Sequence, residues 1–280
     1  MGYDFSIITP SYNQLEYLKL AHASVADQEG VSFEHIVIDG NSTDETTAWL
    51  SEQDDIKWIS EPDRSMYEAI NKGLKMATGR ICAYINCDEQ YLPGALKRVQ
   101  DHFNAHKDAD IVYGDMIVTD PKGDIVAYRK SYPLHWWLVR ASHFYIPSCT
   151  LFWKREIQEA GHFFPPQYRH VSDAEYAIDM LTSGYKASHL KDYTSIFTAT
   201  GSNIGCSDEA IGEIKAAIQR GPLWVRSTRH LLVGLRRIIK LLDGAYKQNF
   251  PLEYDLYLPD NLAERASRKA DQASFKWRAW

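Results

Sequence analysis

Long apolar runs are missing from this chain of 280 residues. No uninterrupted stretch of about 18 apolar residues occurs, and a helix that crosses a bilayer needs about that length. Residues 1–9 also lack the basic stretch and the long apolar run of a signal peptide. From these two absences we expect a cytoplasmic protein, and a peripheral place on the inner face of the membrane stays open.

Cysteine and basic residues are also in short supply. The cysteines are scattered, with no C-x-x-C pair, and they are Cys82, Cys87, Cys149 and Cys206. This scatter argues against a zinc site or a disulfide framework, so free thiols are expected. Lys and Arg number 31 against 37 Asp and Glu, which gives a net charge of −6. That balance argues against nucleic acid as the main partner, because phosphate binding usually needs a basic face.

The first 110 residues alternate between short apolar runs and segments with helical spacing. The expected strands cover 5–9, 35–39, 57–60 and 80–86, and the expected helices cover 15–26, 66–77 and 93–103, with another after Gly40. Alternation with short loops predicts parallel βαβ units, so the fold class is α/β with a mostly parallel, Rossmann-like sheet. In such sheets ligands bind at the carboxyl ends of the strands.

The pattern changes after residue 115. A hairpin is expected around 117–128, a short helix over 133–142, a strand over 150–153, a helix over 173–181 and an extended segment over 187–198. The remainder, from Asp208, reads as helical. We therefore expect one domain over residues 1–205, with halves at 1–110 and 111–205, followed by a helical segment over 206–280.

Carboxylates follow three of the expected strands. Asp39, Asp63 and Asp88 cannot cluster at one sheet edge unless a cation or hydrogen-bond donors offset their repulsion. Helix capping is the alternative for any one of them alone, because Asp is strongly preferred at helix starts. The three together favour a site.

The most informative of these strand ends is Asn86-Cys87-Asp88. Residues 86 and 88 point the same way from an extended chain, and Cys87 between them should face the protein. The amide oxygen of Asn86 and the carboxylate of Asp88 are hard ligands that suit Mg²⁺ or Mn²⁺. The sequence therefore predicts a divalent metal at this turn, and an ordinary capped turn is the alternative.

Four motifs together resemble the family 2 glycosyltransferases of GT-A fold. They read SIITPSYN (6–13), VIDGNSTDET (37–46), SEPDRSMYEAINKG (60–73) and YINCDE (84–89), in the family's order and with its spacing. A further block, IPSCTLFWKREIQEAGHF (146–163), is similar to the family's acceptor-side half. The resemblance implies a nucleotide-sugar half over 1–110 and an acceptor half over 111–205.

The resemblance also implies roles for individual residues. Thr9, Pro10 and Tyr12 would line the nucleotide pocket, Asp39 would meet the base or the ribose, Asp63 would meet the nucleoside, and Asn71 and Lys72 would lie near the diphosphate. For Lys72, a solvated helix charge is the alternative. Asp88 would coordinate the metal, and because the family commonly has Asp where this chain has Asn86, ligation mainly by Asp88 is expected.

A general base is expected in the second half, at Ser172-Asp173-Ala174-Glu175. The resemblance favours Asp173, with Glu175 in reserve. Residues two apart on a helix face different ways, so only one should reach the acceptor. A base that works near pH 7 needs a pKa raised by burial or by nearby negative charge.

The predicted reaction is transfer of a sugar, with inversion, from a nucleoside diphosphate sugar to a hydroxyl of a glycan or a lipid-linked acceptor. A UDP-sugar is the commonest donor that the resemblance implies. One rival is a sugar nucleotidyltransferase, which would want a glycine-rich, basic loop where Thr9-Pro10-Ser11-Tyr12-Asn13 stands. Another is an inactive module that binds glycan or membrane, which the presence of Asn86 suggests.

Two further segments leave alternatives open. Residues 223–242 carry five basic and no acidic side chains, with Leu231, Leu235, Ile238 and Leu242 at helical spacing. This pattern fits either an anionic membrane surface or packing on the domain or on a second subunit, with the charges solvated. The aromatic residues Trp136, Trp137 and Tyr145, with His143, form either a sugar platform or ordinary packing. The charged tail from Ala263 is expected to be mobile until Trp277 and Trp280 meet a surface.

Overall fold

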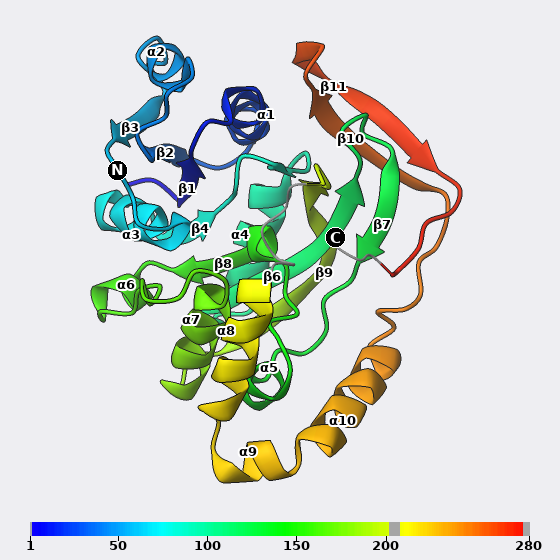
Figure 1. Cartoon of the computed structure of the whole chain (residues 1–280). Coiled ribbons are helices and arrows are strands. Elements are labelled where there is room, and N and C mark those ends of the chain that lie inside the picture. Colours follow the sequence, from blue (N-terminus) through cyan, green and yellow to red (C-terminus); the bar gives the residue numbers. More distant parts are fainter. Residues whose placement is uncertain (1, 202–207, 277–280) are drawn as a thin grey trace.

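The computed structural model describes residues 2–201 and 208–276, and Figure 1 shows the arrangement of their helices and strands. The first part contains β1 (Phe5–Ser11), α1 (Leu15–Ala26), β2 (Phe33–Asp39), α2 (Thr46–Leu50), β3 (Ile56–Ser60), α3 (Met66–Met76), β4 (Ile81–Tyr84), β5 (Glu89–Tyr91) and α4 (Ala95–Ala105). The second part contains β6 (Ile111–Thr119), β7 (Ile125–Arg129), α5 (Trp136–Ala141), a 3-10 turn η1 (Ser148–Thr150), β8 (Leu151–Lys154), α6 (Glu156–Glu159), α7 (Ser172–Thr182) and β9 (Ala187–Thr198). Most of these elements lie where the sequence predicted them, whereas β5, η1 and α6 were not predicted.

One sheet joins the two predicted halves. Its strand order is β3-β2-β1-β4-β8-β6-β9-β5, and β7 pairs with β6 at the side. Strands β3, β2, β1 and β4 are parallel, and so are β6 and β9, whereas β8 runs antiparallel to both β4 and β6. The parallel strands of both halves therefore end at the same edge of the sheet, and the predicted α/β class is confirmed.

Strand β1 is buried along its whole length, as a central strand between two helical layers must be. Alternate residues point to opposite faces. Ile7 packs in a cluster with Val25 of α1 and Val99 of α4, whereas Ile8 packs in a cluster with residues of α3, α5 and α7. Helices α1 and α4 thus cover one face of the sheet, and α3, α5 and α7 cover the other.

Helix α3 lies directly against β1 at Gly73. A Cβ atom there would come within 2.6 Å of Cγ2 of Ile8, so glycine is what allows this close approach. The helix begins after Ser65, whose hydroxyl accepts a hydrogen bond from the backbone N–H of Glu68. The contact holds α3, including Tyr67 and Asn71, against the sheet.

The C-terminal part is only partly helical, which corrects the sequence prediction. Three helices follow residue 207: α8 (Asp208–Gln219), α9 (Leu223–Ser227) and α10 (Arg229–Leu242). The chain then forms an antiparallel hairpin from β10 (Leu252–Leu258) and β11 (Asn261–Ala270). The reason is an apolar side chain at every second position from Leu252 to Leu258, which is strand periodicity. The charged stretch from Ala263 belongs to β11, while Trp277, Trp280 and Cys206 lie outside the described residues.

The hairpin completes a small core of its own. Tyr254 and Leu256 pack with Leu92, Ile117 and Ile196 of the main sheet. Figure 1 shows β10 and β11 beside β7, at the far side of the molecule from β3. None of the helices in the described ranges is long and apolar enough to cross a membrane.

Candidate functional site

The ends of β1, β2, β3 and β4 meet at one edge of the sheet. The register places Ser11 beside Asp39, and Asp39 beside Ser60. The next residue after β4, Ile85, donates its backbone N–H to the carbonyl of Ile8 at 2.9 Å. Segments that are far apart in the sequence are therefore brought together where parallel sheets bind ligands.

Cys87 lies at the centre of this meeting point and faces the protein, as predicted. Its thiol contacts the carbonyl oxygen of Pro10 at 3.4 Å. Burial raises the pKa of Cys87 to about 12, and the nearby carboxylates of Asp88 and Asp39 raise it further in the same direction. Asp39 ends β2 and Asp88 follows β4, so both belong to the strand ends that meet at this edge. Cys82, Cys87 and Cys149 are all buried free thiols, in agreement with the sequence prediction.

The carboxylate of Asp39 is fully buried and held in a fixed orientation. Its Oδ2 accepts hydrogen bonds from the backbone N–H of Ser42 at 2.9 Å and from the hydroxyl of Ser60 at 2.6 Å. Its Oδ1 accepts from the hydroxyl of Ser42 at 2.5 Å. These donated hydrogen bonds offset its negative charge. The sequence pattern did not reveal Ser60, because its partner lies on another strand.

Two loops at this edge are tied together. Asn13 donates its backbone N–H to the hydroxyl of Ser42 at 2.8 Å, and its amide oxygen accepts from the N–H of Thr43 at 2.8 Å. Asn13 and Asn41 have positive φ angles of 52° and 66°, a conformation that Asn tolerates better than most residues. Beside them the ring of Tyr12 is 60% exposed. The tied loops therefore present an aromatic face to solvent at the strand ends.

Thr9 and Pro10 lie behind this rim. Thr9 is fully buried, and its hydroxyl pairs with Nε2 of His35 at 2.9 Å. Pro10 is also buried, and its carbonyl oxygen contacts Cys87. Of the three residues predicted to line the nucleotide pocket, Tyr12 is the one whose side chain is exposed, because it follows the last residue of β1.

The predicted metal turn has the donor chemistry that a hard cation prefers. The Oδ1 atom of Asn86 is buried, and within the described part of the chain it has no hydrogen-bond partner. Its backbone N–H is bound by Glu89 at 2.7 Å. Asn86 and Asp88 together thus fit a divalent cation. No group of three or more His, Cys, Asp or Glu side chains in residues 2–201 and 208–276 converges as a metal site. A cation here would therefore need oxygen atoms from a ligand or from water.

Burial raises the pKa of Glu89, beside this turn, to about 8, and the neighbouring charge of Asp88 acts in the same direction. Glu89 is thus a second acid at the strand end, and it is buried. Its carboxylate stabilises the turn by accepting a hydrogen bond from the backbone N–H of Asn86.

Asp63 and Lys72 form an ion pair instead of standing apart. Lys72 Nζ lies 2.6 Å from Asp63 and 2.7 Å from Glu61, and it also donates to the carbonyl of Pro62. Burial raises the pKa of Asp63, although Lys72 acts in the opposite direction. Burial alone would lower the pKa of Lys72, but the two carboxylates raise it. The alternative of a freely solvated lysine is therefore wrong.

Asn71 connects the two halves of the domain. Its amide donates to the carbonyl of Phe164 at 2.7 Å and accepts from the N–H of Phe164 at 3.0 Å. Both polar atoms of the side chain are therefore bonded to one residue of the acceptor half. This pairing was not visible in the sequence, because the partner lies 93 residues away.

Asp173 has the environment of a carboxylate with a raised pKa. It lies in the first turn of α7, its Oδ1 accepts from the N–H of Ala174 at 2.7 Å, and the hydroxyl of Tyr67 also hydrogen-bonds it. Burial raises its pKa to about 6, and these hydrogen bonds limit the rise. Tyr67 lies in the 60–73 motif, but no role was predicted for it from the sequence. Its role depends on how α3 packs against α7.

Glu175 has the opposite environment. Arg140 donates two hydrogen bonds of 2.7 Å to its two oxygens, and Arg220 adds a third contact at 2.9 Å. Burial would raise the pKa of Glu175, but the two arginines outweigh this and lower it. A carboxylate held by two cations is a weak proton acceptor, so the geometry favours Asp173 over Glu175.

The aromatic residues before the acceptor block are packed rather than displayed. Tyr145 is buried and stacks on Tyr132 with ring centroids 4.3 Å apart. Trp136 and Trp137 pack against the main core. His143, by contrast, is exposed, and Arg236 donates a hydrogen bond to its ring. The structure therefore supports packing for Trp136, Trp137 and Tyr145.

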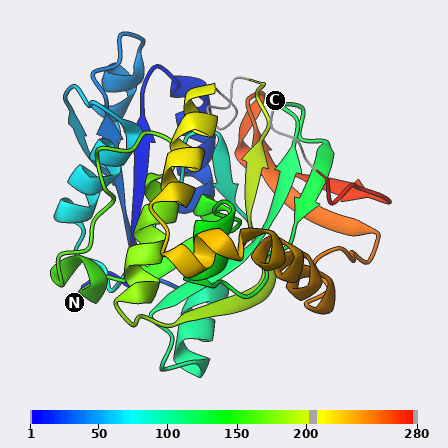
Figure 2. The same ribbon diagram turned by 60° about the horizontal axis from the view of Figure 1, so that its bottom comes forward.

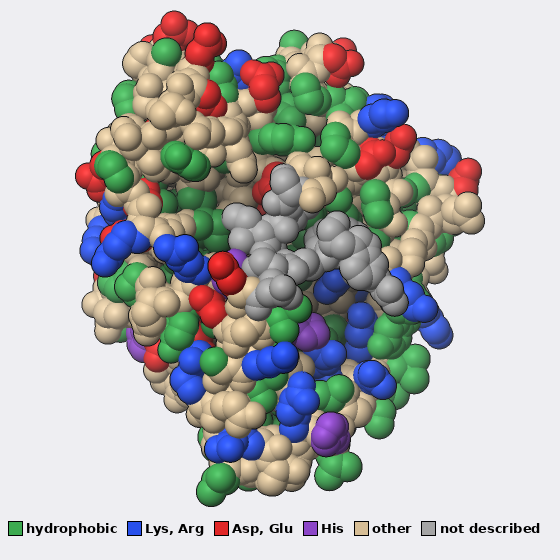
Figure 3. Space-filling model, viewed as in Figure 1, with side chains coloured by type: hydrophobic (Ala, Val, Ile, Leu, Met, Phe, Trp, Pro, Cys, Tyr) green, Lys and Arg blue, Asp and Glu red, His purple; other side chains and the backbone are tan. Residues whose placement is uncertain are grey.

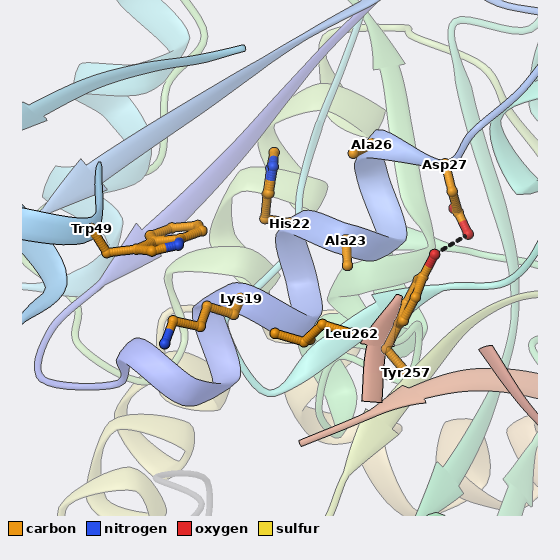
Figure 4. A pocket seen from close by; sticks show the side chains of 8 residues that line it. All are labelled: Lys19, His22, Ala23, Ala26, Asp27, Trp49, Tyr257 and Leu262. Carbon is orange, nitrogen blue, oxygen red and sulfur yellow. Dashed lines mark hydrogen bonds between the residues drawn. The ribbon is translucent and has the colours of Figure 1, made fainter. Parts of the chain in front are cut away.

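Two cavities flank the sheet. One, of about 120 Å³, lies between α5, α7 and α8, and Asp173, His143 and Glu175 are among its lining residues. The other, of about 400 Å³, lies on the opposite flank between α1, Trp49 and the hairpin. Figure 4 shows its lining residues, with the hydroxyl of Tyr257 donating to Asp27 at 2.9 Å. The larger cavity is away from the strand ends, so the smaller one is the better candidate for a substrate.

A mostly parallel sheet with carboxylates at its strand ends is the architecture of GT-A glycosyltransferases, and solved structures share it. The S. aureus TarS fragment 1–349 in complex with UDP-GlcNAc matches with a TM-score of 0.61 and 17% identity, over 85% of this chain and 72% of that one. A mannosyltransferase from Pyrobaculum calidifontis in complex with GDP-Man and Mn²⁺ matches with a TM-score of 0.55 and 17% identity, over 85% and 76%.

Residues 6–165 match the model of glycosyl transferase family 2, and the chain belongs to this family. A PGL/p-HBAD biosynthesis glycosyltransferase of Mycobacterium bovis is 34% identical over 127 residues, which are 41% of this chain and 47% of the relative. An uncharacterized glycosyltransferase of Mycobacterium tuberculosis is 38% identical over 89 residues, or 31% and 34%. The chain thus spans about half the length of the first relative and about a third of the second.

Proposed function

We propose that this chain transfers a sugar from a nucleoside diphosphate sugar to a hydroxyl acceptor, with inversion at the anomeric carbon. The observation that carries the proposal is that the neighbouring parallel strands β2, β1 and β4 end at one sheet edge, where Asp39, the exposed ring of Tyr12 and Asp88 stand at or just after the strand ends. Family membership and the donor complexes of two structural neighbours support it.

The donor would lie across the ends of β1, β2 and β4. In the proposal Tyr12 stacks on the base, and the loops tied by Asn13 and Ser42 form the floor beneath the nucleoside. Asp39 orients Ser42 and meets the ribose or base, with Asp63 nearby. Lys72 and Asn71 act on the diphosphate side by positioning Asp63 and Phe164. A UDP-sugar is the first candidate donor.

Asp88 and Asn86 would hold a divalent cation, Mn²⁺ or Mg²⁺. The unpartnered amide oxygen of Asn86 supports this assignment. When bound, such a cation stabilises the negative charge of the departing diphosphate. In this proposal, two protein ligands are assigned among residues 2–201 and 208–276, so the affinity for metal should depend strongly on whether the nucleotide is present.

Asp173 would be the general base. Its carboxylate accepts the proton of the acceptor hydroxyl while that oxygen forms a bond to the anomeric carbon. The bond from the anomeric carbon to the diphosphate breaks at the same time, and the electron pair leaves with the nucleotide. Burial, which raises the pKa of Asp173 to about 6, makes it a stronger acceptor than an exposed Asp while leaving it mostly ionised at pH 7.

The proposed acceptor is a glycan or a lipid-linked hydroxyl compound at the inner face of the membrane. The cavity between α5, α7 and α8 supports an acceptor approach next to Asp173. Glycosyl transfer is favoured over nucleotidyl transfer to a sugar phosphate, because residues 9–13 are not a glycine-rich, basic loop.

A thermal-shift panel tests the proposal. Nucleoside diphosphates at about 100 times their Kd should stabilise the chain by about 2.7 kcal/mol, which raises Tm by about 5–10 °C for a domain of this size. The shift should need Mn²⁺ and should disappear in Asp88→Ala, but not in Asp271→Ala, where the carboxylate is exposed on the hairpin side.

Turnover with Mn²⁺ separates the rivals. Release of the nucleoside diphosphate from the donor supports transfer, whereas release of pyrophosphate from a nucleoside triphosphate and a sugar phosphate would identify a nucleotidyltransferase. Nucleotide binding without any turnover would indicate an inactive module. Full turnover by Asp88→Ala would overturn the assignment of this residue.

A further inference from the structure

Helices α9 and α10 present an unusually apolar surface to solvent. We define the α9–α10 surface by its exposed apolar residues: Leu223, Trp224, Leu231, Leu235, Ile238, Leu241 and Leu242. Leu223, Leu231 and Leu242 are each at least 75% exposed. Figure 2 shows the two helices lying along the outside of the domain. A contiguous apolar surface of this kind usually marks an interaction site.

A surface helix usually packs on its domain by its apolar side, but α10 has the opposite orientation. Positions 231, 235, 238 and 242 fall on one side of the helix, as the sequence predicted, but this side faces outward. The side toward the domain carries Leu232 and Ile239 together with three cations, so the expectation that the charges are solvated is wrong for these three. They are Arg229, Arg236 and Lys240.

These cations hold the helix in place. Arg229 donates to the carbonyl of Ala141 at 3.0 Å, and Arg236 donates to the hydroxyl of Ser142 at 3.0 Å. Lys240 Nζ lies 4.7 Å from the centre of the Tyr246 ring. Just beyond the helix, Asp243 pairs with Lys191 at 2.7 Å. The outward position of the leucines is therefore fixed by specific contacts on the opposite side.

The charge around the α9–α10 surface is of one sign. Residues 223–242 contain no Asp or Glu, and Arg226 and Arg237 are exposed. Figure 3 shows Lys and Arg side chains gathered over the part of the face formed by these helices, with hydrophobic side chains at its outer edge. A second copy docking by the same surface would bring two sets of cations together with no acid from this segment between them. An anionic lipid surface would neutralise the exposed cations and accept the leucines and the tryptophan.

We propose that the α9–α10 surface docks on an anionic lipid bilayer, with the two helices lying in the plane of the interface. The inference does not depend on the proposed function, although it adds to it. Helix α5 packs against α7, α9 and α10, so docking would place the helix that carries Asp173 one layer away from the lipid headgroups. A lipid-linked acceptor would then reach the base from the membrane side.

Co-sedimentation of the full chain with vesicles tests the docking. At low salt, vesicles of phosphatidylcholine with about one third phosphatidylglycerol should carry the protein down, and vesicles of phosphatidylcholine alone should bind it at least tenfold more weakly. Leu231→Gln combined with Leu242→Gln should reduce binding at least tenfold. The matched control, Val126→Gln combined with Leu262→Gln, changes two exposed apolar residues elsewhere and should bind like the wild type.

A second pair of variants tests the charge. Arg226→Gln combined with Arg237→Gln should weaken binding and reduce its salt dependence, whereas Lys107→Gln combined with Lys122→Gln should not. Absence of binding at low salt, or equal binding by the leucine variant and the wild type, would overturn the proposal. A dimer in sedimentation velocity that the leucine variant abolishes would also overturn it, in favour of a second copy.

Donor binding is measured in the same variants. Because the α9–α10 surface is exposed and distant from Tyr12 and Asp39, the leucine variant should keep the wild-type Tm and the wild-type shift with nucleotide and Mn²⁺. Loss of vesicle binding with an intact nucleotide shift supports docking. Vesicle binding with no nucleotide shift in the wild type would refute the proposed function and leave the docking standing.

Discussion

Asp173 and Glu175 show how two acids two residues apart acquire opposite chemistry. Both lie in the first turn of α7, where the helix dipole favours negative charge. Burial raises the pKa of Asp173 to about 6, against the effect of its neutral hydrogen-bond donors, whereas Arg140 and Arg220 outweigh burial at Glu175 and lower its pKa. The fold, and not the residue type, therefore selects the base candidate.

Substitution of Asp173 by Asn is expected to separate activity from stability. Removal of the base should lower kcat by about 10² to 10⁴. The carboxyl has a folded pKa of about 6 against an ordinary 3.8, so its ionised form destabilises the protein above pH 6. Asp173→Asn should therefore raise the free energy of unfolding at pH 8 by up to about 3 kcal/mol, and the gain should vanish as the pH falls toward 4.

Urea denaturation at pH 8 and at pH 4 measures the second part, and kcat/KM against pH measures the first. In the wild type kcat/KM should fall tenfold per unit below about pH 6, because the base must be ionised to accept a proton. Glu175→Gln is the comparison, since it breaks an ion pair and should destabilise the protein at pH 8. A pH profile with no inflection near 6 would exclude Asp173 as the base.

The residues that could be predicted are those with a local signature. Asp39, Asn86 and Asp88 follow apolar strands, and parallel topology brings such strand ends together whatever the details of packing. Ser60 and Tyr67 could not be predicted in their roles, because each depends on a partner in another element. Thr9 shows the reverse error: it stands at a strand end, but the pleat turns its side chain toward His35.

Among the elements, α3 illustrates how one helix serves both halves of the domain. Gly73 lets it approach β1, and Asn71 on the same helix binds both backbone groups of Phe164. Tyr67 also stacks on the ring of Phe164 with centroids 5.6 Å apart. The segment around Phe164 is thus attached to α3 by polar and aromatic contacts together.

Asn71→Ala is expected to lower the free energy of unfolding by about 2–4 kcal/mol. It removes two hydrogen bonds and leaves the N–H and the carbonyl of Phe164 without their partner. Chemical denaturation measures the loss. Lys75→Ala, on the same helix, is the control and should change stability by less than about 0.5 kcal/mol.

Donor affinity decides between the two roles of Asn71. If the role of the Asn71 amide is to hold the backbone of Phe164, Asn71→Ala should change the Kd for nucleotide by less than about threefold. The Kd is measured at a temperature well below the Tm of the variant. A loss of affinity of tenfold or more without a loss of stability would instead place Asn71 on the diphosphate, as the family resemblance implies.

The elements predicted well are those with a strong period of their own. Helix α3 and strands β1, β2 and β4 fall within a few residues of the predicted ranges, because apolar spacing at 3.6 or at 2 residues identifies them. The helix prediction fails at the C-terminal hairpin because β11, Asn261–Ala270, has no regular alternation of apolar and polar residues that would identify a strand. Its partner β10 alternates clearly, but only the packing against Leu92 and Ile196 gives that alternation a buried side.

At the scale of the whole molecule, the hairpin closes the sheet's far side and reaches back to the first helix. The backbone of Tyr257 exchanges two hydrogen bonds with the side chain of Gln90, at 2.8 and 3.0 Å. Arg265 of β11 donates to both oxygens of Asp27, at the end of α1, and to the carbonyl of Tyr91 at 2.9 Å. Residues more than 230 positions apart are therefore joined directly.

Arg265 is expected to anchor the hairpin to the domain. Arg265→Ala leaves Asp27 and the carbonyl of Tyr91 without this donor, and the loss should lower the free energy of unfolding by about 2–4 kcal/mol, because the guanidinium is largely buried. Arg268→Ala removes a partly exposed arginine on the same strand that lies 3.9 Å from Asp124, so it should cost less than about 1 kcal/mol.

Limited proteolysis shows whether the loss is local or global. If the hairpin detaches first, Arg265→Ala should be cut between α10 and β11 while the nucleotide shift, which depends on residues 9–88, is retained. The anchoring role would be excluded by equal proteolysis of Arg265→Ala and Arg268→Ala. In a denaturant titration, nucleotide binding could instead be lost at the same concentration at which the hairpin unfolds. That result would show that the hairpin and the donor-binding half unfold as one unit, joined through the contact with α1.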